Sequence, residues 1–383
     1  MNAAASLYEQ HTFQYGDYTL AYETCGEGPP VVLMHGVLLD SLVYRELGTR
    51  FAAEGCRVIL FDLLGHGRSD KSNDPKDYRA EHFTDQLIGL LDHLGIDQAM
   101  IGGVSLGSVV TLHMAARAPE RVSAMFLEMP VMEWSAPWAA VILAPILFTA
   151  RYLSPAYRPL SRLVKRLPRP RKLSQEWLGS LMNAGSLDPE IAAAILHGCL
   201  VGPAVPTEAA RHAMHMPALV IGHGGDKLHS VEDARVLAEQ LPNARLVEAR
   251  HAIEMRTKPD RLWPQIVEFV TEYVGSYETS VTAGSLGAAA VDRGLKQRFE
   301  ETLERVRSAP ADGPFKPSNE LKLKMYALYR QASDGDVQGK RPGMLDVVAR
   351  FKYDAWAAVK GLSAEAAMQR YVDEVEKLEK KHG

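Results

Sequence analysis

Residues 99–107 read AMIGGVSLG, and the run SVVTLHMAARAPE follows directly at residues 108–120. An apolar run that ends in small residues before a helical pattern predicts a strand, a tight turn and a helix. Within the turn, Gly103-Val104-Ser105-Leu106-Gly107 has the pattern G-x-S-x-G. The glycines leave room for a sharp reversal that exposes the serine hydroxyl at the carboxyl end of the strand. This stretch therefore predicts Ser105 as a nucleophile.

Strand-like runs alternate with helical segments on both sides of this turn, up to about residue 275. Such alternation predicts an α/β fold with a mostly parallel sheet that is covered by helices on both faces. Residues 12–26, with a turn near Gly16-Asp17, predict an antiparallel hairpin at one edge of the sheet. The other expected strands are VVLMHG (31–36), RVILFDLLGHG (57–67), AMFLEMP (124–130), ALVIGHGGD (218–226) and ARLVEARH (244–251).

The chain of 383 residues is longer than the roughly 250 to 300 residues that one core supports, so we expect two domains. The alternation of strands and helices stops over residues 132–216. This segment has a helical pattern rich in apolar and basic residues, which predicts an inserted cap. Residues 276–290, SYETSVTAGSLGAAA, are small and nearly uncharged and predict a flexible linker. The sequence thus predicts domains at 1–275 and 291–383.

Composition excludes several classes of protein. Hydrophobic residues make up 46% and charged residues 23%, and a net charge of −4 favours no particular partner, so we expect no nucleic-acid binding. Cys25, Cys56 and Cys199 have no paired or metal-ligand spacing, and we expect no disulfide, metal or cofactor. The first residues lack the features of a secretion signal, and no run approaches the ~20 apolar residues of a membrane span. We expect a cytoplasmic location.

A serine hydroxyl needs a base to take its proton, and the base needs an acid to orient it. Asp226 and His251 each follow a predicted strand, and they continue the chain order Ser, acid, His. We therefore predict a triad of Ser105, Asp226 and His251. Glu128, at the end of an earlier strand, is the alternative acid.

The developing oxyanion needs two donors. The backbone N–H of Leu106 is the first candidate. The second is the N–H of Val37, in the loop where His35-Gly36 turns the chain. His35 itself, and the loop containing Gly65-His66-Gly67, are interpreted as scaffolding.

Residues 12–275 resemble the α/β-hydrolase superfamily, with HG, GHGRSD, GVSLG, GGD and RHAI in the usual order. The resemblance implies the fold and the triad but not the substrate, because the superfamily includes esterases, thioesterases, lactonases and acyltransferases. A serine at position 105 argues against dehalogenase or epoxide hydrolase chemistry. Two positions depart from the usual pattern: Arg250 replaces a glycine before the histidine, and Val104 replaces a frequent histidine.

The last ~90 residues predict a small four-helix domain, from the helical spacing of Leu295, Phe299, Leu303 and Val306 and from three later amphipathic runs. The runs YALYRQA (326–332), RPGMLD (341–346), KYDAW (352–356) and AMQRY (367–371) closely resemble the acyl-CoA-binding protein family. The resemblance covers residues 292–382 and implies binding of long-chain acyl-CoA.

Aromatic rings and fixed positive charges are the groups that an adenine and a 3'-phosphate require. By the resemblance, the phosphate contacts are Tyr326, Arg330 and Lys352, and the nucleotide contacts are Tyr329 and Tyr371. Arg330 replaces the usual lysine. Tyr353 replaces a frequent tryptophan, and Arg307 and Lys316 are uncertain contacts because the first connection is longer than usual. The alternative is that these aromatics form the core of the bundle, which is the role we expect for Trp356.

In the predicted cap, residues 138–148 (WAAVILAPILF) are strongly apolar, and residues 151–172 contain eight Lys or Arg and no acid. We expect the apolar part to line an acyl tunnel. The basic part would receive either CoA phosphates or an anionic membrane surface. An ordinary cap with a solvated basic face is the alternative.

The two resemblances together favour an acyl-CoA thioesterase, in which Ser105 forms an acyl-enzyme that water cleaves. An acyltransferase uses the same nucleophile with another acceptor, and a lipase or carboxylesterase attacks an ester instead. A buffer or sensor of acyl-CoA without catalysis is the remaining alternative, against which the order of the predicted triad argues.

Overall fold

The computed structural model describes the chain except residues 1–6, 202–204, 309–318, 340, 344–345 and 383. The chain divides into two compact units, Met1–Glu278 and Thr279–Gly383. The boundary lies inside the predicted linker 276–290, and each unit is described by itself.

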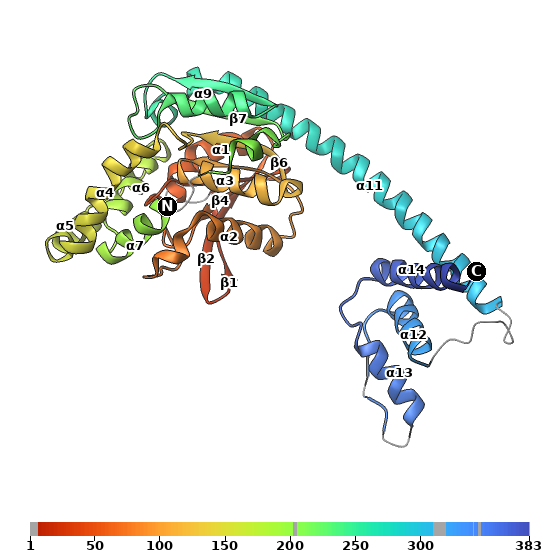
Figure 1. The fold of residues 1–383 in the computed structure, drawn as a ribbon. Coiled ribbons are helices and arrows are strands. Elements are labelled where there is room, and N and C mark those ends of the chain that lie inside the picture. The colour runs from red at the N-terminus through yellow and green to blue at the C-terminus, as the bar shows by residue number, and fades with distance from the viewer. Residues whose placement is uncertain (1–6, 202–204, 309–318, 340, 344–345, 383) are drawn as a thin grey trace. The chain divides into compact units, whose positions relative to one another are not determined.

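The first unit is built on one sheet of eight strands. The strand order is β1-β2-β4-β3-β5-β6-β7-β8, and every pair from β4 to β8 is parallel. The predicted hairpin is present as the antiparallel edge pair β1 and β2 (Figure 1). The strands are β1 (Glu9–Tyr15), β2 (Tyr18–Cys25), β3 (Pro30–Met34), β4 (Arg57–Asp62), β5 (Ala99–Val104), β6 (Val122–Glu128), β7 (Ala218–His223) and β8 (Ala244–Ala249).

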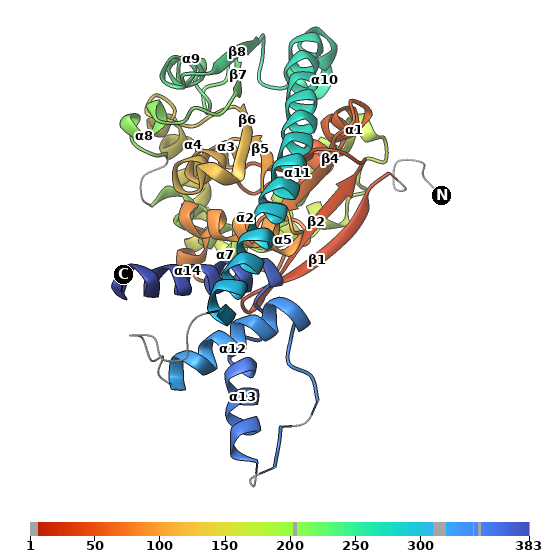
Figure 2. The ribbon, with the colours of Figure 1, turned by 90° about the vertical axis from the view of Figure 1, so that its right-hand side faces the viewer.

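Helices cover both faces of the sheet because its central strands are apolar on both sides. In β3, Val32 and Met34 face one core while Val31 and Leu33 face the other, as the two-residue period of a strand requires. The first core is covered by α2 (Ala80–His93), α3 (Leu106–Arg117) and α9 (Val231–Gln240). The second is covered by α1 (Arg45–Ala53), α10 (Glu254–Thr257) and the first turns of α11 (Trp263–Ser308). Figure 2 shows α10 next to the start of α11.

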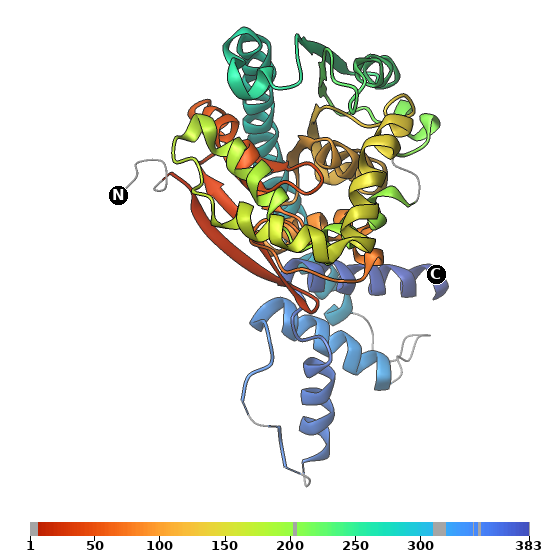
Figure 3. The same cartoon turned by 90° about the vertical axis from the view of Figure 1, so that its left-hand side faces the viewer.

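The cap is helical, as predicted, and enters the chain between β6 and β7. Figure 3 shows its helices, in yellow to yellow-green, on one side of this unit. The carboxylate of buried Asp233, in α9, accepts the backbone N–H groups of Met132, Trp134 and Ser135 at 2.8–3.0 Å, which ties the entry to the cap onto the core. The helices of this insertion are α4 (Ala136–Tyr152), α5 (Ser154–Arg166), α6 (Glu176–Gly185), α7 (Pro189–Leu200) and α8 (Glu208–His212).

The predicted flexible linker is helical in the structure. Residues 276–290 lie within α11, which runs from Trp263 to Ser308. The alanines of this stretch favour a helix while Gly284 and Gly287 disfavour one, so composition alone did not decide between a linker and a helix.

The second unit is a four-helix bundle, in agreement with the sequence. It consists of the last turns of α11, α12 (Asn319–Asp334), α13 (Val347–Ala357) and α14 (Ala364–His382). Its core contains Phe299 from α11, Leu328 and Ala332 from α12, and Tyr371 and Val372 from α14. Phe299 and Leu303, whose helical spacing was noted in the sequence, therefore lie on the side of α11 that packs into this core.

Candidate active site and acyl-CoA-binding face

Ser105 lies in the turn between β5 and α3 with a φ angle of 55°, a conformation that is rare for a residue with a Cβ. Its glycine neighbours are required by close backbone approach. A Cβ at Gly103 or at Gly107 would lie 2.3 Å from the carbonyl oxygen of Met34 in β3. The hydroxyl of Ser108 donates to the carbonyl oxygens of Gly103 and Glu128 and holds the turn from behind.

Backbone strain concentrates at the carboxyl ends of three neighbouring strands. Among the described residues other than glycine, only Leu38, Ser105 and Met129 have positive φ angles. They follow β3, β5 and β6, which are adjacent in the sheet. Such conformations cost on the order of 1–3 kcal/mol each and gather at functional sites, which favours this edge as the reactive one.

Ser105 is paired with His229. The Nε2 atom of His229 lies 2.9 Å from the hydroxyl oxygen of Ser105, and its Nδ1 atom lies 2.9 Å from a carboxylate oxygen of Asp226. The other oxygen of Asp226 accepts the N–H groups of Leu228 at 2.8 Å and of His229 at 3.2 Å. Burial acts to raise the pKa of Asp226, but these hydrogen bonds lower it below its usual value. The structure thus brings Ser105 and Asp226 together through one imidazole.

The structure corrects the predicted partner of Ser105. His251 follows β8 as expected, but it is exposed. Among the described residues, its ring has no hydrogen bond to Ser105 or Asp226. Sequence reasoning chose His251 from its place after the last strand and missed His229. The available signal was the spacing Asp226-x-x-His229, which lets a carboxylate and an imidazole meet within one turn.

The two expected oxyanion donors belong to segments that adjoin the serine. Leu106 is the first residue of α3, so its N–H has no acceptor within the helix. Gly36 packs against Ser105, since a Cβ at Gly36 would lie 3.5 Å from the Cβ of Ser105. The N–H of Leu39 donates to the carbonyl oxygen of Gly36 at 3.1 Å, and Leu38 has a φ angle of 65°. Val37 therefore lies in a tight turn directly beside the nucleophile.

Glu128, the alternative acid, is engaged in a buried ionic cluster. It accepts hydrogen bonds from Tyr44 at 2.8 Å and from Arg256 at 2.7 Å, and it lies 3.4 Å from His223. Burial acts to raise its pKa, but Arg256 and His223 lower it to about 2. Its carboxylate is therefore a structural anchor and not the partner of the Ser105 imidazole.

The loops around the site have the scaffolding role expected from the sequence. The Nε2 atom of His35 accepts the N–H of Leu63 at 3.1 Å, and burial lowers the pKa of this imidazole. The carboxylate of buried Asp62 accepts the N–H groups of Ser41 at 2.7 Å and Arg68 at 3.1 Å. These bonds fix the loops after β3 and β4 against each other.

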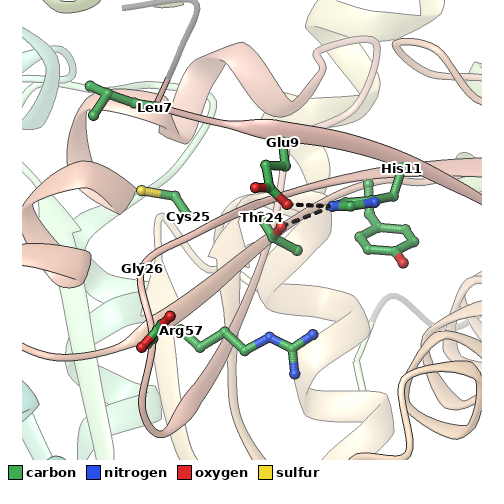
Figure 4. Close-up of a pocket in the computed structure, with 9 residues that line it drawn as sticks. Leu7, Glu9, His11, Thr24, Cys25, Gly26 and Arg57 are labelled. Atoms are coloured by element: carbon green, nitrogen blue, oxygen red, sulfur yellow. Dashed lines mark hydrogen bonds and ion pairs between the residues drawn. The ribbon is translucent and has the colours of Figure 1, made fainter.

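The first unit contains, among others, the following two cavities in its described residues. One of about 570 Å³ borders the turn that carries Val37 and is lined by Leu38, Arg68, Lys71 and the cap residue Lys165. The other, of about 460 Å³, is a polar hollow on β1, β2 and β4 (Figure 4). There the Nε2 atom of His11 lies 3.0 Å from the hydroxyl oxygen of Thr24 and 3.7 Å from a carboxylate oxygen of Glu9, so this imidazole already has polar partners.

In the second unit, α12 and α13 bring together four of the residues singled out in the sequence. The ammonium of Lys352 lies 5.1 Å from the ring centre of Tyr326, and the guanidinium of Arg330 lies 4.5 Å from that of Trp356. Arg330 also pairs with Asp334 at 2.9 Å. Trp356 is half-buried, and its indole N–H donates to the carbonyl oxygen of Gly335. We expected Trp356 in the core of the bundle, but it lies beside the guanidinium of Arg330 instead.

The remaining predicted contacts differ in their placement. Tyr329 is half-buried on the same helix as Arg330. Tyr371 is only 4% exposed and packs edge-on against Phe299, so most of its ring belongs to the core of the bundle, and its contact with a nucleotide stays a prediction. The side chains of Arg307 and Lys316 lie outside the described residues.

Comparison with known families matches both units. A family model described as "alpha/beta hydrolase fold" matches residues 29–253, more than half of the chain. A model described as "Acyl CoA binding protein" matches residues 296–375.

Curated relatives match the second unit. An acyl-CoA-binding protein of Gossypium hirsutum is 46% identical over 85 residues, which cover 22% of this chain and 91% of that protein. Acyl-CoA-binding domain-containing protein 5 of Gallus gallus is 43% identical over 81 residues, which cover 21% of this chain and 16% of that protein. The chain therefore spans only about a sixth of that relative.

Solved structures match the first unit. An enol-lactonase from Burkholderia xenovorans LB400 superposes with a TM-score of 0.55 at 22% identity, covering 68% of this chain and 100% of that one. A thioesterase domain from the curacin biosynthetic pathway gives a TM-score of 0.52 at 20% identity, covering 68% and 98%. At these identities the likeness establishes the fold alone.

Proposed function

Because this chain belongs to the α/β-hydrolase family and carries a C-terminal acyl-CoA-binding domain, we propose that it is a serine hydrolase of long-chain acyl-CoA thioesters. The observation that carries the proposal is the 2.9 Å contact between Ser105 and His229, whose other nitrogen meets Asp226. The names of the curated relatives supply the ligand class, acyl-CoA.

In the proposed acylation step, the Ser105 hydroxyl oxygen attacks the thioester carbonyl carbon while Nε2 of His229 takes its proton. Asp226 accepts a hydrogen bond from Nδ1 and stabilises the imidazolium that forms. The carbon–sulfur bond then breaks, and the imidazolium proton passes to the leaving thiolate. The products are CoA with a free thiol and an acyl ester on Ser105.

In the proposed deacylation step, His229 takes a proton from water, and the resulting hydroxide attacks the acyl ester. The proton returns to Ser105, and the fatty acid leaves. In both steps the N–H groups of Leu106 and Val37 receive the negative oxygen, and the loss of one such donor typically costs about 2.7–4 kcal/mol.

The proposed role of the acyl-CoA-binding domain is capture. Tyr326 with Lys352, and Arg330 with Trp356, pair aromatic surface with positive charge, which suits a nucleotide and its phosphates. A ligand held on the same chain reaches Ser105 at a raised effective concentration.

The test is incubation of the full chain with palmitoyl-CoA, with thiol release and the acyl product measured separately. Ser105→Ala and His229→Ala should each lower kcat by roughly a thousandfold or more, because serine and base act as one unit. His251→Ala is the matched control and should retain most of the activity, since its ring is exposed.

Each departure from this result has a defined meaning. Thiol release that survives Ser105→Ala contradicts a serine mechanism. Loss of activity in His251→Ala but not in His229→Ala contradicts His229 as the base. An acyl product other than the free acid, formed only when an alcohol or amine is added, would identify an acyltransferase instead.

A further inference from the structure

The outer face of the cap carries a stripe of large apolar side chains. In α4, Trp138, Val141, Phe148 and Tyr152 are 49%, 62%, 56% and 69% exposed. Their spacing of three, seven and four residues places them on one side of the helix. In this helix only Ala139 and Ala150 are buried. These four side chains are therefore exposed and not enclosed by the protein, and the acyl tunnel stays a prediction.

The next helix, α5, is amphipathic and continues the exposed apolar surface. Leu160 and Leu163 are each 57% exposed, and Leu167 directly after the helix is 46% exposed. Spacings of three and four residues again place them on one side. The exposed cations Arg162 and Arg166 lie on a different side of the helix from these leucines, and Ser161 is buried.

The charged residues of α4, α5 and the segment after them are all positive. Residues 134–175 contain eight Lys or Arg and no Asp or Glu. Two of the cations have partners within the protein: Arg158 pairs with Glu190, and Arg169 donates to the carbonyl oxygens of Val164 and Leu167. Arg162, Arg166 and Arg171 are exposed.

The two helices have the composition of a membrane-binding element but not the shape of a span. No single helix in the described ranges is long and apolar enough to cross a bilayer. Ala136–Tyr152 and Tyr157–Arg166 reach the required length and hydropathy together but are bent by 103°. A bent apolar pair with a basic face suits the boundary between headgroups and acyl chains.

We infer that the outer face of α4 and α5 is a docking surface for an anionic lipid membrane. Val141, Phe148 and Leu163, with their neighbours, enter the boundary between headgroups and acyl chains. Arg162, Arg166 and Arg171 contact the lipid phosphates. The uniform positive charge favours an anionic bilayer over a second copy of the chain, because two identical basic faces repel each other. The inference does not depend on the proposed hydrolysis.

The experiment is flotation of the full chain with vesicles of phosphatidylcholine, alone or containing phosphatidylserine. We expect binding to the anionic vesicles that weakens as salt is raised. The triple variant Arg162→Glu, Arg166→Glu, Arg171→Glu should bind them at least about tenfold more weakly. The triple variant Val141→Asp, Phe148→Asp, Leu163→Asp should show an equal loss of vesicle binding, because charged side chains replace the apolar ones that insert.

The matched control is Lys76→Glu, Arg79→Glu, Lys258→Glu, which makes the same change in net charge at exposed positions outside the cap and should retain most of the binding. All variants should keep the thermal unfolding temperature and the turnover of a short soluble ester.

Three outcomes would overturn the inference: no binding of the unaltered chain to anionic vesicles, equal binding to both vesicle types, or undiminished binding by the aspartate variant. Self-association of the chain that Val141→Asp disperses, without vesicle binding, would assign the surface to a second copy.

Discussion

At the scale of single residues, local geometry decides which histidine meets the serine. Asp226 accepts two backbone N–H groups from the turn that it begins, and this turn carries His229 to the carboxylate and to Ser105. The hydroxyl of Ser135, at the entry to the cap, accepts the N–H of Ser230 at 2.8 Å and holds the far end of the same turn. The position of the imidazole thus depends on the cap as well as on the sheet.

The buried pair of Glu128 and Arg256 makes a residue-scale prediction. Arg256→Met leaves a buried carboxylate without its cation and should lower the free energy of unfolding by about 3–5 kcal/mol at neutral pH. Arg235→Met, which breaks exposed pairs with Glu232 and Glu248, is the control and should have little effect. Urea unfolding followed by circular dichroism measures both.

The same pair predicts how this loss depends on pH. The folded pKa of Glu128, about 2, lies below the ordinary value of 4.5, so its stabilisation is complete above pH 4.5 and is lost as the pH falls toward 2. The difference between the wild type and Arg256→Met should therefore shrink over that interval. A difference that stays constant would show that the ionic pair does not cause it.

At the scale of elements, the nucleophile depends on how closely α3 approaches β3 and β5. Gly103 and Gly107 both lie against the carbonyl oxygen of Met34, so two glycines of the motif serve packing between elements. The position of Ser105 follows from this contact, because any larger residue would push the helix away from the sheet.

Gly107→Ala tests this close approach. Its Cβ would lie 2.3 Å from a backbone oxygen, so we expect a loss of about 1–3 kcal/mol or more in stability together with loss of turnover. Gly275→Ala in α11 is the control. A Cβ there meets no atom within 4 Å, and alanine should stabilise the helix slightly. Calorimetry and hydrolysis of a short ester compare the two, and equal stability in both variants would contradict the steric argument.

At the scale of the whole molecule, two compact units with separate cores share one chain and one helix, α11. The proposed division of labour places chemistry on the first unit and capture of the CoA portion on the second. Hydrolysis of a substrate that carries CoA should therefore depend on both units, and hydrolysis of a small ester on the first unit alone.

The double variant Arg330→Ala, Lys352→Ala tests that division. Hydrogen bonds to charged groups contribute about 1.5–3 kcal/mol each, so KM for palmitoyl-CoA should rise roughly tenfold or more. KM for a short soluble ester should stay unchanged. Lys322→Ala, Lys360→Ala, which removes two other exposed cations of the same unit, is the control. A parallel rise for both substrates would contradict the capture role.

The sequence by itself determined the features that depend on local pattern. Strand and helix periodicity predicted the sheet, the edge hairpin, the cap and the helical bundle. The motif around Ser105 predicted the strained turn, because only small residues fit where α3 meets β3.

Only the tertiary structure decided which distant side chains meet. It placed His229 and not His251 against Ser105, occupied Glu128 with Arg256, buried Tyr371 and turned Trp138 and Phe148 outward. Periodicity identifies one face of an element but not what lies opposite that face. The partner of a side chain follows from loop geometry and packing, which join residues that the sequence keeps far apart.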